Sequence, residues 1–215
     1  MATTKLFWEH PYQTTLETVV TASADNRVRL RETIFYAFSG GQESDAGTIG
    51  RHQVLAASKN DFDIDYLLAD GHGLKPGDAV QVVIDWERRY RLMRLHFAAE
   101  LILELAYQQL PAIEKIGAHI AEQKARLDFL WPENISSQFP LLLEQARQLI
   151  TADRPIISDY SDREKQRRYW EVEGFARVAC GGTHLRRTGE VGDIRLKRKN
   201  IGGGKERIEV ILAQE

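Results

Sequence analysis

The residues best suited to chemistry surround the only cysteine of the chain. Cys180 stands four residues before His184, in the sequence CGGTH. Thiolate and imidazole are common ligands of Zn²⁺, which proteins usually hold with four such groups. Gly181 and Gly182 separate the pair, and glycine allows a tight turn and the close approach of a substrate to the backbone. Two ligands make half of a metal site, so a second pair must be sought elsewhere in the chain.

His96 and Glu100 are the best candidates for that second pair. They stand four residues apart in LHFAAEL, within a segment whose apolar residues recur at helical spacing. Side chains at this spacing share one helix face, with Cβ atoms about 6 Å apart, as in zinc-binding helices. We therefore expect a metal site of His96, Glu100, Cys180 and His184. The alternative is an ordinary surface pair on the helix and a Cys–His spacing that arises from loop composition. Glu100 has two possible roles: a ligand, which its position favours, or a general base acting on water.

The segments that would position these residues indicate an α+β protein. TLETVVTASADNRVRLRET alternates around a turn at 24–26, and short strands with glycine-rich turns follow, which favours a small N-terminal β-barrel. Helical spacing runs from about Glu87 to Gln109, before Pro111. A strand pair over 119–131, a second helix capped by Ser136 or Ser137, and further strands complete the chain. We place the boundary between a β-barrel domain, 1–86, and a second domain, 87–215.

Composition narrows the class of protein. The single cysteine excludes an internal disulfide framework and favours a reducing compartment, so we expect the cytoplasm. The N-terminus does not resemble a signal peptide, and no apolar run reaches the roughly 18 residues of a membrane span. The net charge is −2, but basic residues gather in RRYRLMR and in RLKRKNIGGGKER. This pattern suits either binding of a polyanion or simple solvation of arginine and lysine at the surface. His10, His52 and His72 are expected at the surface.

Three longer stretches resemble one known family. CGGTHLRRTGEVGDIRLKRKN resembles the CGGTH-x-x-x-TGEIG segment of alanyl-tRNA editing proteins, which are stand-alone relatives of the editing domain of alanyl-tRNA synthetase and share a core with threonyl-tRNA synthetase. TIFYAFSGGQESDAGTI resembles the family's FYP-x-GGGQ-x-x-D-x-G loop, and DWERRYRLMRLH resembles the run before its metal helix. The resemblance covers nearly the whole chain. It implies a small β-barrel followed by an α/β two-layer editing core.

The resemblance also implies an activity: zinc-dependent hydrolysis, in trans, of mischarged tRNA for alanine, chiefly seryl-tRNA and sometimes glycyl-tRNA. His96, Cys180 and His184 match three of the family's four metal positions. Zinc would either activate water or anchor the substrate's α-amino group. Thr183 and Gln42 are the expected catalytic residues. The expected substrate-binding residues are Gly40, Gly41, Phe97, Gly181 and Gly182, and the expected tRNA-binding residues are Arg88, Arg91, Lys197, Lys199 and Lys205. The sequence contains no pattern that fixes an oligomeric state.

The sequence departs from the family pattern at two important positions. Glu100 replaces the second histidine of the usual HxxxH motif, and a site with both thiolate and carboxylate neutralises Zn²⁺ and makes it a weaker Lewis acid. Phe97 stands where threonine is usual and removes a hydroxyl that would contact a serine side chain. These changes motivate an alternative, a degenerate relative that binds tRNA or another ligand without efficient hydrolysis. Cys180 could also be a nucleophile, although its CGGTH context favours ligation. His119 matches a family position and lies either near the pocket or on an ordinary strand.

Overall fold

The computed structural model describes residues 2–213. Contacts divide the chain into two compact units, one formed by the described residues up to Tyr90 and the other by those from Arg91 onward. Antiparallel sheets dominate both units, and the described residues also form two α-helices. This architecture confirms the α+β class expected from the sequence.

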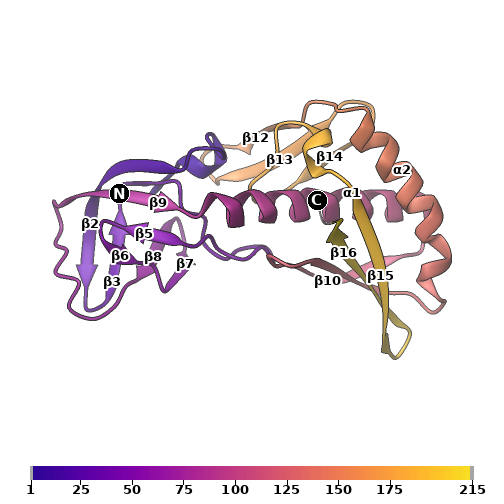
Figure 1. The fold of residues 1–215 in the computed structure, drawn as a ribbon, viewed down its shortest axis with the longest axis horizontal. Coiled ribbons are helices and arrows are strands. Elements are labelled where there is room, and N and C mark those ends of the chain that lie inside the picture. Colours follow the sequence, from indigo (N-terminus) through magenta and orange to yellow (C-terminus); the bar gives the residue numbers. More distant parts are fainter. Residues whose placement is uncertain (1, 214–215) are drawn as a thin grey trace. The chain divides into compact units, whose positions relative to one another are not determined.

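The first unit is built on a seven-stranded sheet in the order β6-β5-β9-β2-β3-β8-β7 (Figure 1). The predicted hairpin is present, because β2 and β3 join through a turn at Asp25 and Asn26. Alternate residues such as Val20, Val82 and Ile64 are buried, as expected for a sheet with one face on a core. The elements are β1 (Thr4–Lys5), η1 (Leu6–Trp8), β2 (Thr15–Ala24), β3 (Arg27–Leu30), β4 (Glu32–Thr33), β5 (Gly47–Ile49), β6 (His52–Gln53), β7 (Ala56–Asn60), β8 (Asp63–Leu67) and β9 (Ala79–Ile84).

The glycine-rich loop before β5 is held by structural contacts. Gly47 has φ 156°, and a Cβ there would lie 2.1 Å from the carbonyl oxygen of Val83, so no other residue fits. Asp45 accepts a hydrogen bond from the backbone N–H of Tyr36 (2.6 Å) and pairs with Arg89. Neither side chain of the Asp45–Arg89 pair has exposed surface. Arg89 therefore belongs to the core of the first unit and is unavailable to the basic patch suggested by RRYRLMR.

In the second unit a long helix lies between two sheets. Figure 1 shows α1 running between the three-stranded sheet β12-β13-β14 and the four-stranded sheet β10-β11-β16-β15. Accordingly α1 is buried on most sides. Met93, Phe97 and Leu101 are buried in addition to the apolar residues that recur at helical spacing, which are Leu92, Leu95, Ala99, Ile102, Leu103 and Ala106. The elements are α1 (Trp86–Gln109), β10 (Glu114–Ile120), β11 (Ala125–Leu130), η2 (Ile135–Gln138), α2 (Phe139–Thr151), β12 (Ile157–Asp162), β13 (Arg167–Val172), β14 (Ala176–Ala179), η3 (Thr188–Val191), β15 (Ile194–Gly202) and β16 (Lys205–Leu212).

Two local predictions were wrong. The second helix does not begin at a capping Ser136 or Ser137, because a 3₁₀ turn precedes it and the Asn134 side chain accepts the N–H of Ser136 (3.0 Å). His72 is buried rather than at the surface. Its ring nitrogens contact the carbonyl oxygen of Asp25 (3.1 Å) and the N–H of Leu74 (3.0 Å), so the imidazole closes two turns of the first unit.

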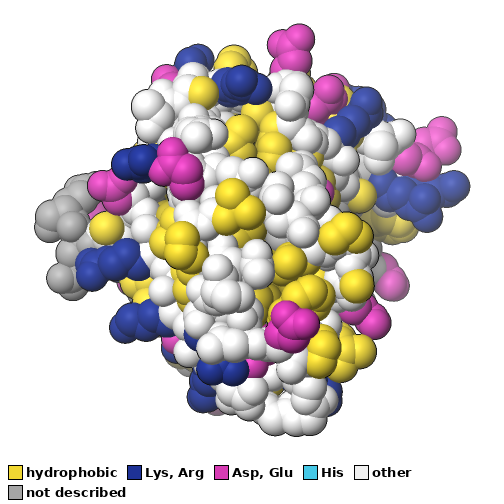
Figure 2. Space-filling model, turned by 90° about the vertical axis from the view of Figure 1, so that its right-hand side faces the viewer, with side chains coloured by type: hydrophobic (Ala, Val, Ile, Leu, Met, Phe, Trp, Pro, Cys, Tyr) yellow, Lys and Arg dark blue, Asp and Glu magenta, His cyan; other side chains and the backbone are white. Residues whose placement is uncertain are grey.

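The surface around α2 is mixed in character. Figure 2 views this side, where hydrophobic side chains lie among charged ones. Leu141 of α2 is one of the exposed hydrophobic residues. A groove of about 500 Å³ lies here, lined by Leu143 and Ile150 of α2, the first residues of β15, and Ala213. No helix among residues 2–213 is both long and apolar enough to span a membrane.

Candidate metal centre

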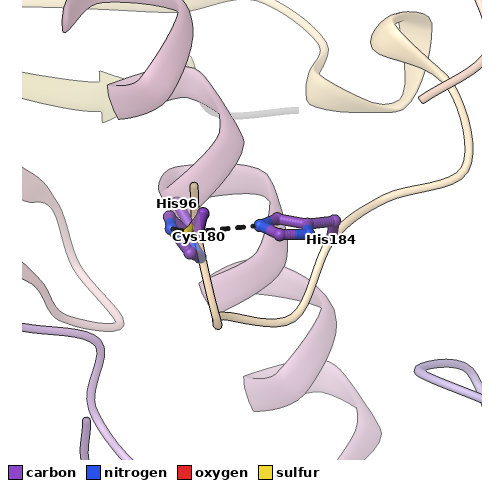
Figure 3. A group of neighbouring side chains, drawn as sticks. All are labelled: His96, Cys180 and His184. Atoms are coloured by element: carbon purple, nitrogen blue, oxygen red, sulfur yellow. Dashed lines mark hydrogen bonds between the residues drawn. The ribbon is translucent and has the colours of Figure 1, made fainter. Parts of the chain in front are cut away.

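The predicted metal-site residues come from one helix and one loop. His96 and Glu100 occupy successive turns of α1, and Cys180 directly follows β14. The backbone N–H of Cys180 donates to the carbonyl oxygen of Arg168 (3.0 Å), which fixes the start of the loop against β13. His184 lies further along the loop, and Figure 3 shows its ring and that of His96 converging on Cys180.

The TGEV segment after His184 holds the far end of this loop. The Thr188 hydroxyl donates to the carbonyl oxygen of Leu149 (2.7 Å) and accepts the N–H of Arg154 (2.9 Å). One carboxylate oxygen of Glu190 accepts the backbone N–H groups of Arg186 and Arg187, both at 3.0 Å. The segment therefore ties the loop to the end of α2. These hydrogen bonds give Thr188 and Glu190 a structural role, without a role at the metal site.

Three donor atoms converge at the centre of the site. The Sγ atom of Cys180 lies 3.4 Å from Nε2 of His96 and 3.3 Å from Nε2 of His184. All three atoms lie within 4.8 Å of one another. Both histidines are buried and the cysteine is half-buried. The structure thus brings together three residues that the sequence placed in two separate pairs.

Glu100 contacts this cluster from the next turn of α1. Its Oε1 lies 3.3 Å from Nε2 of His96 and 3.9 Å from Sγ of Cys180. Its Oε2 accepts a hydrogen bond from the indole N–H of Trp170 (3.1 Å). Glu100 is not among the residues whose donor atoms are all within 4.8 Å of one another, so its carboxylate adjoins two of the three.

The charges of the cluster favour a thiolate. Burial opposes ionisation of Cys180, but the positive charges and hydrogen bonds of His96 and His184 outweigh it and lower the pKa of the thiol to about 6. Burial likewise lowers the pKa of His96, but the Cys180 thiolate and then Glu100 outweigh it and raise this pKa to about 10. Burial raises the pKa of Glu100, and His96 is the largest of the causes that bring it below its usual range. These shifts favour the charged forms of Cys180, His96 and Glu100.

These residues fit a zinc ion. Zn–S bonds of about 2.3 Å and Zn–N bonds of about 2.0 Å at tetrahedral angles separate sulfur from nitrogen by about 3.5 Å. The observed separations of 3.3 and 3.4 Å are close to this value. Nδ1 of His96 is buried and has no hydrogen-bond partner among the described residues, so the ring is directed to the cluster through Nε2 alone. The donor set can hold a metal ion.

Phe97 lies beside the site but has no exposed surface. Its ring meets Trp170 edge to face at a centroid distance of 5.1 Å, and it lies 6.4 Å from the ring of His184. Phe97 therefore influences the metal site by packing near the rings of Trp170 and His184.

The loop backbone is accessible at Gly181. Gly181 is exposed, and a Cβ added there would meet no atom within 4 Å. The neighbouring Thr183 is buried. Gly40, Gly41 and Gln42 belong to the first unit, where Gly40 and Gly41 have positive φ and Gln42 is buried. His119 lies on β10 opposite Arg126, outside the His96–Cys180–His184 cluster.

Sequence reasoning missed one residue that contacts the cluster and one that contacts Glu100. Ser158 on β12 contacts Nδ1 of His184 (2.9 Å), and Trp170 on β13 contacts Glu100. Neither residue type signals a metal site, and only the register of β12 against β13 brings the two together.

The expected tRNA-binding residues differ in their surroundings. Lys197 and Lys199 are exposed on β15, an edge strand, and Lys205 is exposed at the start of β16. Arg91 is exposed, and its Nε donates to the carbonyl oxygen of Glu122 (2.8 Å). Arg88 is instead paired with Glu43 (2.9 Å) and donates to the carbonyl oxygen of Ser44.

Comparison with known proteins gives the class of this fold and site. Residues 171–209, which contain Cys180 and His184, match the model of the threonyl and alanyl tRNA synthetase second additional domain. The chain is 32% identical over 218 residues to the alanyl-tRNA editing protein AlaX-M of Pyrococcus horikoshii, covering 98% of each chain. It is 30% identical over 240 residues to the AlaX-M protein of Methanosarcina acetivorans, covering 96% of this chain and 98% of the relative.

A longer relative shares the same region. The chain is 32% identical over 225 residues to an alanine--tRNA ligase of Methanococcus maripaludis, covering 95% of this chain but 25% of the ligase. The matches to AlaX-M extend over nearly the whole length of both chains. The chain belongs to the alanyl-tRNA editing protein family.

Proposed function

We propose that this protein is a zinc-dependent aminoacyl-tRNA deacylase that removes serine, and also glycine, from mischarged tRNA for alanine. The observation that carries the proposal is the convergence of Cys180 Sγ with Nε2 of His96 and of His184. Nearly full-length similarity to alanyl-tRNA editing proteins supports the substrate class. A β-barrel first domain, a two-layer editing core and a cytoplasmic setting are parts of the same proposal.

His96, Cys180 and His184 would hold the ion, with Glu100 as fourth ligand. Glu100 is favoured as a ligand because one carboxylate oxygen already contacts both His96 and Cys180 while the other is held by Trp170. When bound, Zn²⁺ supplies either activation of water or an anchor for the substrate's amino group. A carboxylate that takes part in ligation is not available as the general base.

The remaining residues would orient the ester. The backbone N–H groups of Gly181 and Gly182, with the Thr183 hydroxyl, are assigned to the ester carbonyl or the attacking water. The open space above Gly181 supports this role because a substrate can approach the backbone there. Gly40, Gly41 and Gln42 are assigned to the substrate from the glycine-rich loop. Phe97 would act by fixing the rings of Trp170 and His184. Because phenylalanine carries no hydroxyl, the pocket would have none at this position to recognise serine.

The proposal predicts an esterase activity with a defined order of substrates. Purified protein with one equivalent of zinc should release serine and glycine from tRNA for alanine faster than it releases alanine. Because Phe97 removes a polar contact, we expect serine over glycine by less than about 100-fold, the range of discrimination by apolar pockets. Ester loss is followed over time for seryl-, glycyl- and alanyl-tRNA. Loss of all three at the spontaneous rate would contradict the enzyme and leave the non-catalytic relative as the function.

The exposed lysines of β15 are proposed to bind tRNA phosphates. Lys197 and Lys199 alternate along the strand and so share one face of the sheet. Neither forms an ion pair within residues 2–213, whereas Lys124, in the turn before β11, pairs with Glu209 of β16 (2.5 Å). Lys205 and Arg91 would add to this surface. Arg88 would have to exchange its pair with Glu43 for a phosphate.

Lys197→Ala combined with Lys199→Ala should weaken tRNA binding and its dependence on salt. Each lost phosphate contact lowers the slope of log K against log salt by about 0.7–0.9, so the slope should fall by about 1.5. Binding of deacylated tRNA is measured across a series of salt concentrations. Lys124→Ala is the control, because its ammonium is already paired with Glu209. Edge-strand lysines also prevent strand pairing between molecules. An unchanged slope together with aggregation of the double variant would assign them that role instead.

A further inference from the structure

Two residues behind the metal centre form a single rung of the β12–β13 ladder. Ser158 and Trp170 stand directly opposite each other in the antiparallel register, so their side chains leave the same face of the sheet. Ser158 reaches His184 in the CGGTH loop, and Trp170 reaches Glu100 on α1. One rung therefore contacts one residue from each half of the site.

The Ser158 hydroxyl lies 2.9 Å from Nδ1 of His184, while Nε2 of the same ring lies 3.3 Å from Cys180 Sγ. A histidine that ligates through Nε2 carries its proton on Nδ1, and a hydrogen bond from that N–H fixes the tautomer and the plane of the ring. The Ser158 oxygen is placed to accept it. His96 has no such support, since its Nδ1 is buried without a partner among the described residues. Of the two imidazoles, His184 is the one whose Nδ1 has a side-chain partner among the described residues.

The indole of Trp170 holds the Glu100 carboxylate. An indole N–H can only donate, so it engages Oε2 as an acceptor and leaves Oε1 facing His96 and Cys180. The indole cannot easily move, because Trp170 has no exposed surface and its ring packs against Phe97 and Phe175. The carboxylate therefore presents one defined oxygen to the cluster.

We propose that the Ser158–Trp170 rung is the positioning device of this metal centre, with Ser158 setting the tautomer of His184 and Trp170 setting the rotamer of Glu100. Both are positioning residues, because they act through the ligands. The inference rests on the metal site of the proposed function and adds to it two residues whose chemistry is common in any strand. It also gives Phe97 a role, since its ring packs against one member of the rung.

Cobalt binding to the full chain tests this proposal without an activity assay. Co²⁺ is titrated into metal-free wild type, Ser158→Ala, Ser158→Thr and Trp170→Phe, and the thiolate charge-transfer and d–d bands give affinity and geometry. Loss of a group behind a metal ligand typically costs 10–100-fold in affinity, which we expect for Ser158→Ala. Ser158→Thr keeps the hydroxyl and should restore binding to near the wild-type value. Trp170→Phe should keep the thiolate band but alter the d–d bands, because Glu100 loses its defined orientation.

Ser161→Ala is the matched control. Ser161 is an exposed serine on the same strand whose hydroxyl donates to the carbonyl oxygen of Arg167 (3.3 Å), so its removal should leave cobalt binding unchanged. Circular dichroism of each metal-free variant separates loss of binding from loss of fold. Equal cobalt affinity in wild type and folded Ser158→Ala, or an unchanged d–d spectrum in Trp170→Phe, would overturn the role of that residue. Absence of cobalt binding in folded wild type would instead overturn the metal site itself, and the rung with it.

Discussion

Cys180→Ala is expected to abolish stoichiometric zinc binding and to reduce ester hydrolysis by more than about 100-fold. That is above the 10–100-fold range of groups that stand behind the ligands. The reason is that Cys180 Sγ is the atom shared by both imidazoles, at 3.4 and 3.3 Å, so its removal takes away the only anionic sulfur and the centre of the cluster. Metal content per chain and the rate of seryl-tRNA hydrolysis are measured on the same preparations. His119→Ala is the control, because this histidine lies outside the cluster. The His119→Ala variant should therefore retain zinc.

The ionisation of Cys180 can be followed in the metal-free protein. Because the two histidines lower the pKa of the thiol to about 6, the thiolate should be present at neutral pH and should disappear as pH falls through about 6. Thiolate absorbance in the ultraviolet, with Cys180→Ala subtracted, gives the midpoint. A midpoint near 9, the ordinary value of the thiol, would show that the histidines do not act on it. Zinc retained at full stoichiometry by Cys180→Ala would exclude Cys180 as an essential ligand.

Local patterns predicted the elements of this fold, but not their arrangement. The turn at Asp25–Asn26 and the helix ending at Gln109 follow from nearest-neighbour spacing, and both are present. The position of α1 among two sheets depends on strand pairing between distant segments, which no short-range pattern records. This also explains why Met93 and Leu101 are buried, although they lie outside the single apolar face that helical spacing indicated.

The residues of the metal site likewise separate into those that local spacing indicated and those that depend on strand pairing. His96–Glu100 and Cys180–His184 are each local spacings, and their residue types are enough to indicate metal ligands. The two pairs were joined into one set because each supplies half of a four-ligand site, and the resemblance of CGGTH to a known family supported this joining. Ser158 could not be found by either route, because a hydroxyl on a strand is unremarkable until the β12–β13 register places it 2.9 Å from an imidazole. The roles assigned to Thr183 and Gln42 stay predictions.

The basic run RRYRLMR shows how burial changes the meaning of a charge. In the sequence its arginines form one cationic group, but in the structure the adjacent residues Arg88 and Arg89 have different surroundings. Arg88 keeps partial exposure and pairs with Glu43, whereas Arg89 is enclosed with Asp45. Arg89 also donates to the backbone carbonyl oxygens of Ile34 (2.6 Å) and Pro11 (3.0 Å). A single guanidinium thus joins three segments of the first unit and the first turn of α1.

Arg89→Met should therefore destabilise the protein by about 3–5 kcal/mol, because it leaves the Asp45 carboxylate buried without its counter-charge. The substitution keeps an unbranched stem of similar length, so loss of packing is small. The free energy of unfolding is measured by urea denaturation. Arg88→Met is the matched control, because its ion pair lies nearer the surface and such pairs contribute about 0–1 kcal/mol.

Combining Arg89→Met with Asp45→Asn provides a further test of the cause. The amide oxygen can still accept the N–H of Tyr36, while the unpaired negative charge is removed. If the uncompensated charge is the main cost, the double variant should be more stable than Arg89→Met alone. A double variant as unstable as the sum of the two single changes would place the cost in the lost hydrogen bonds to Ile34 and Pro11. Equal stability of Arg89→Met and Arg88→Met would contradict the burial of the pair.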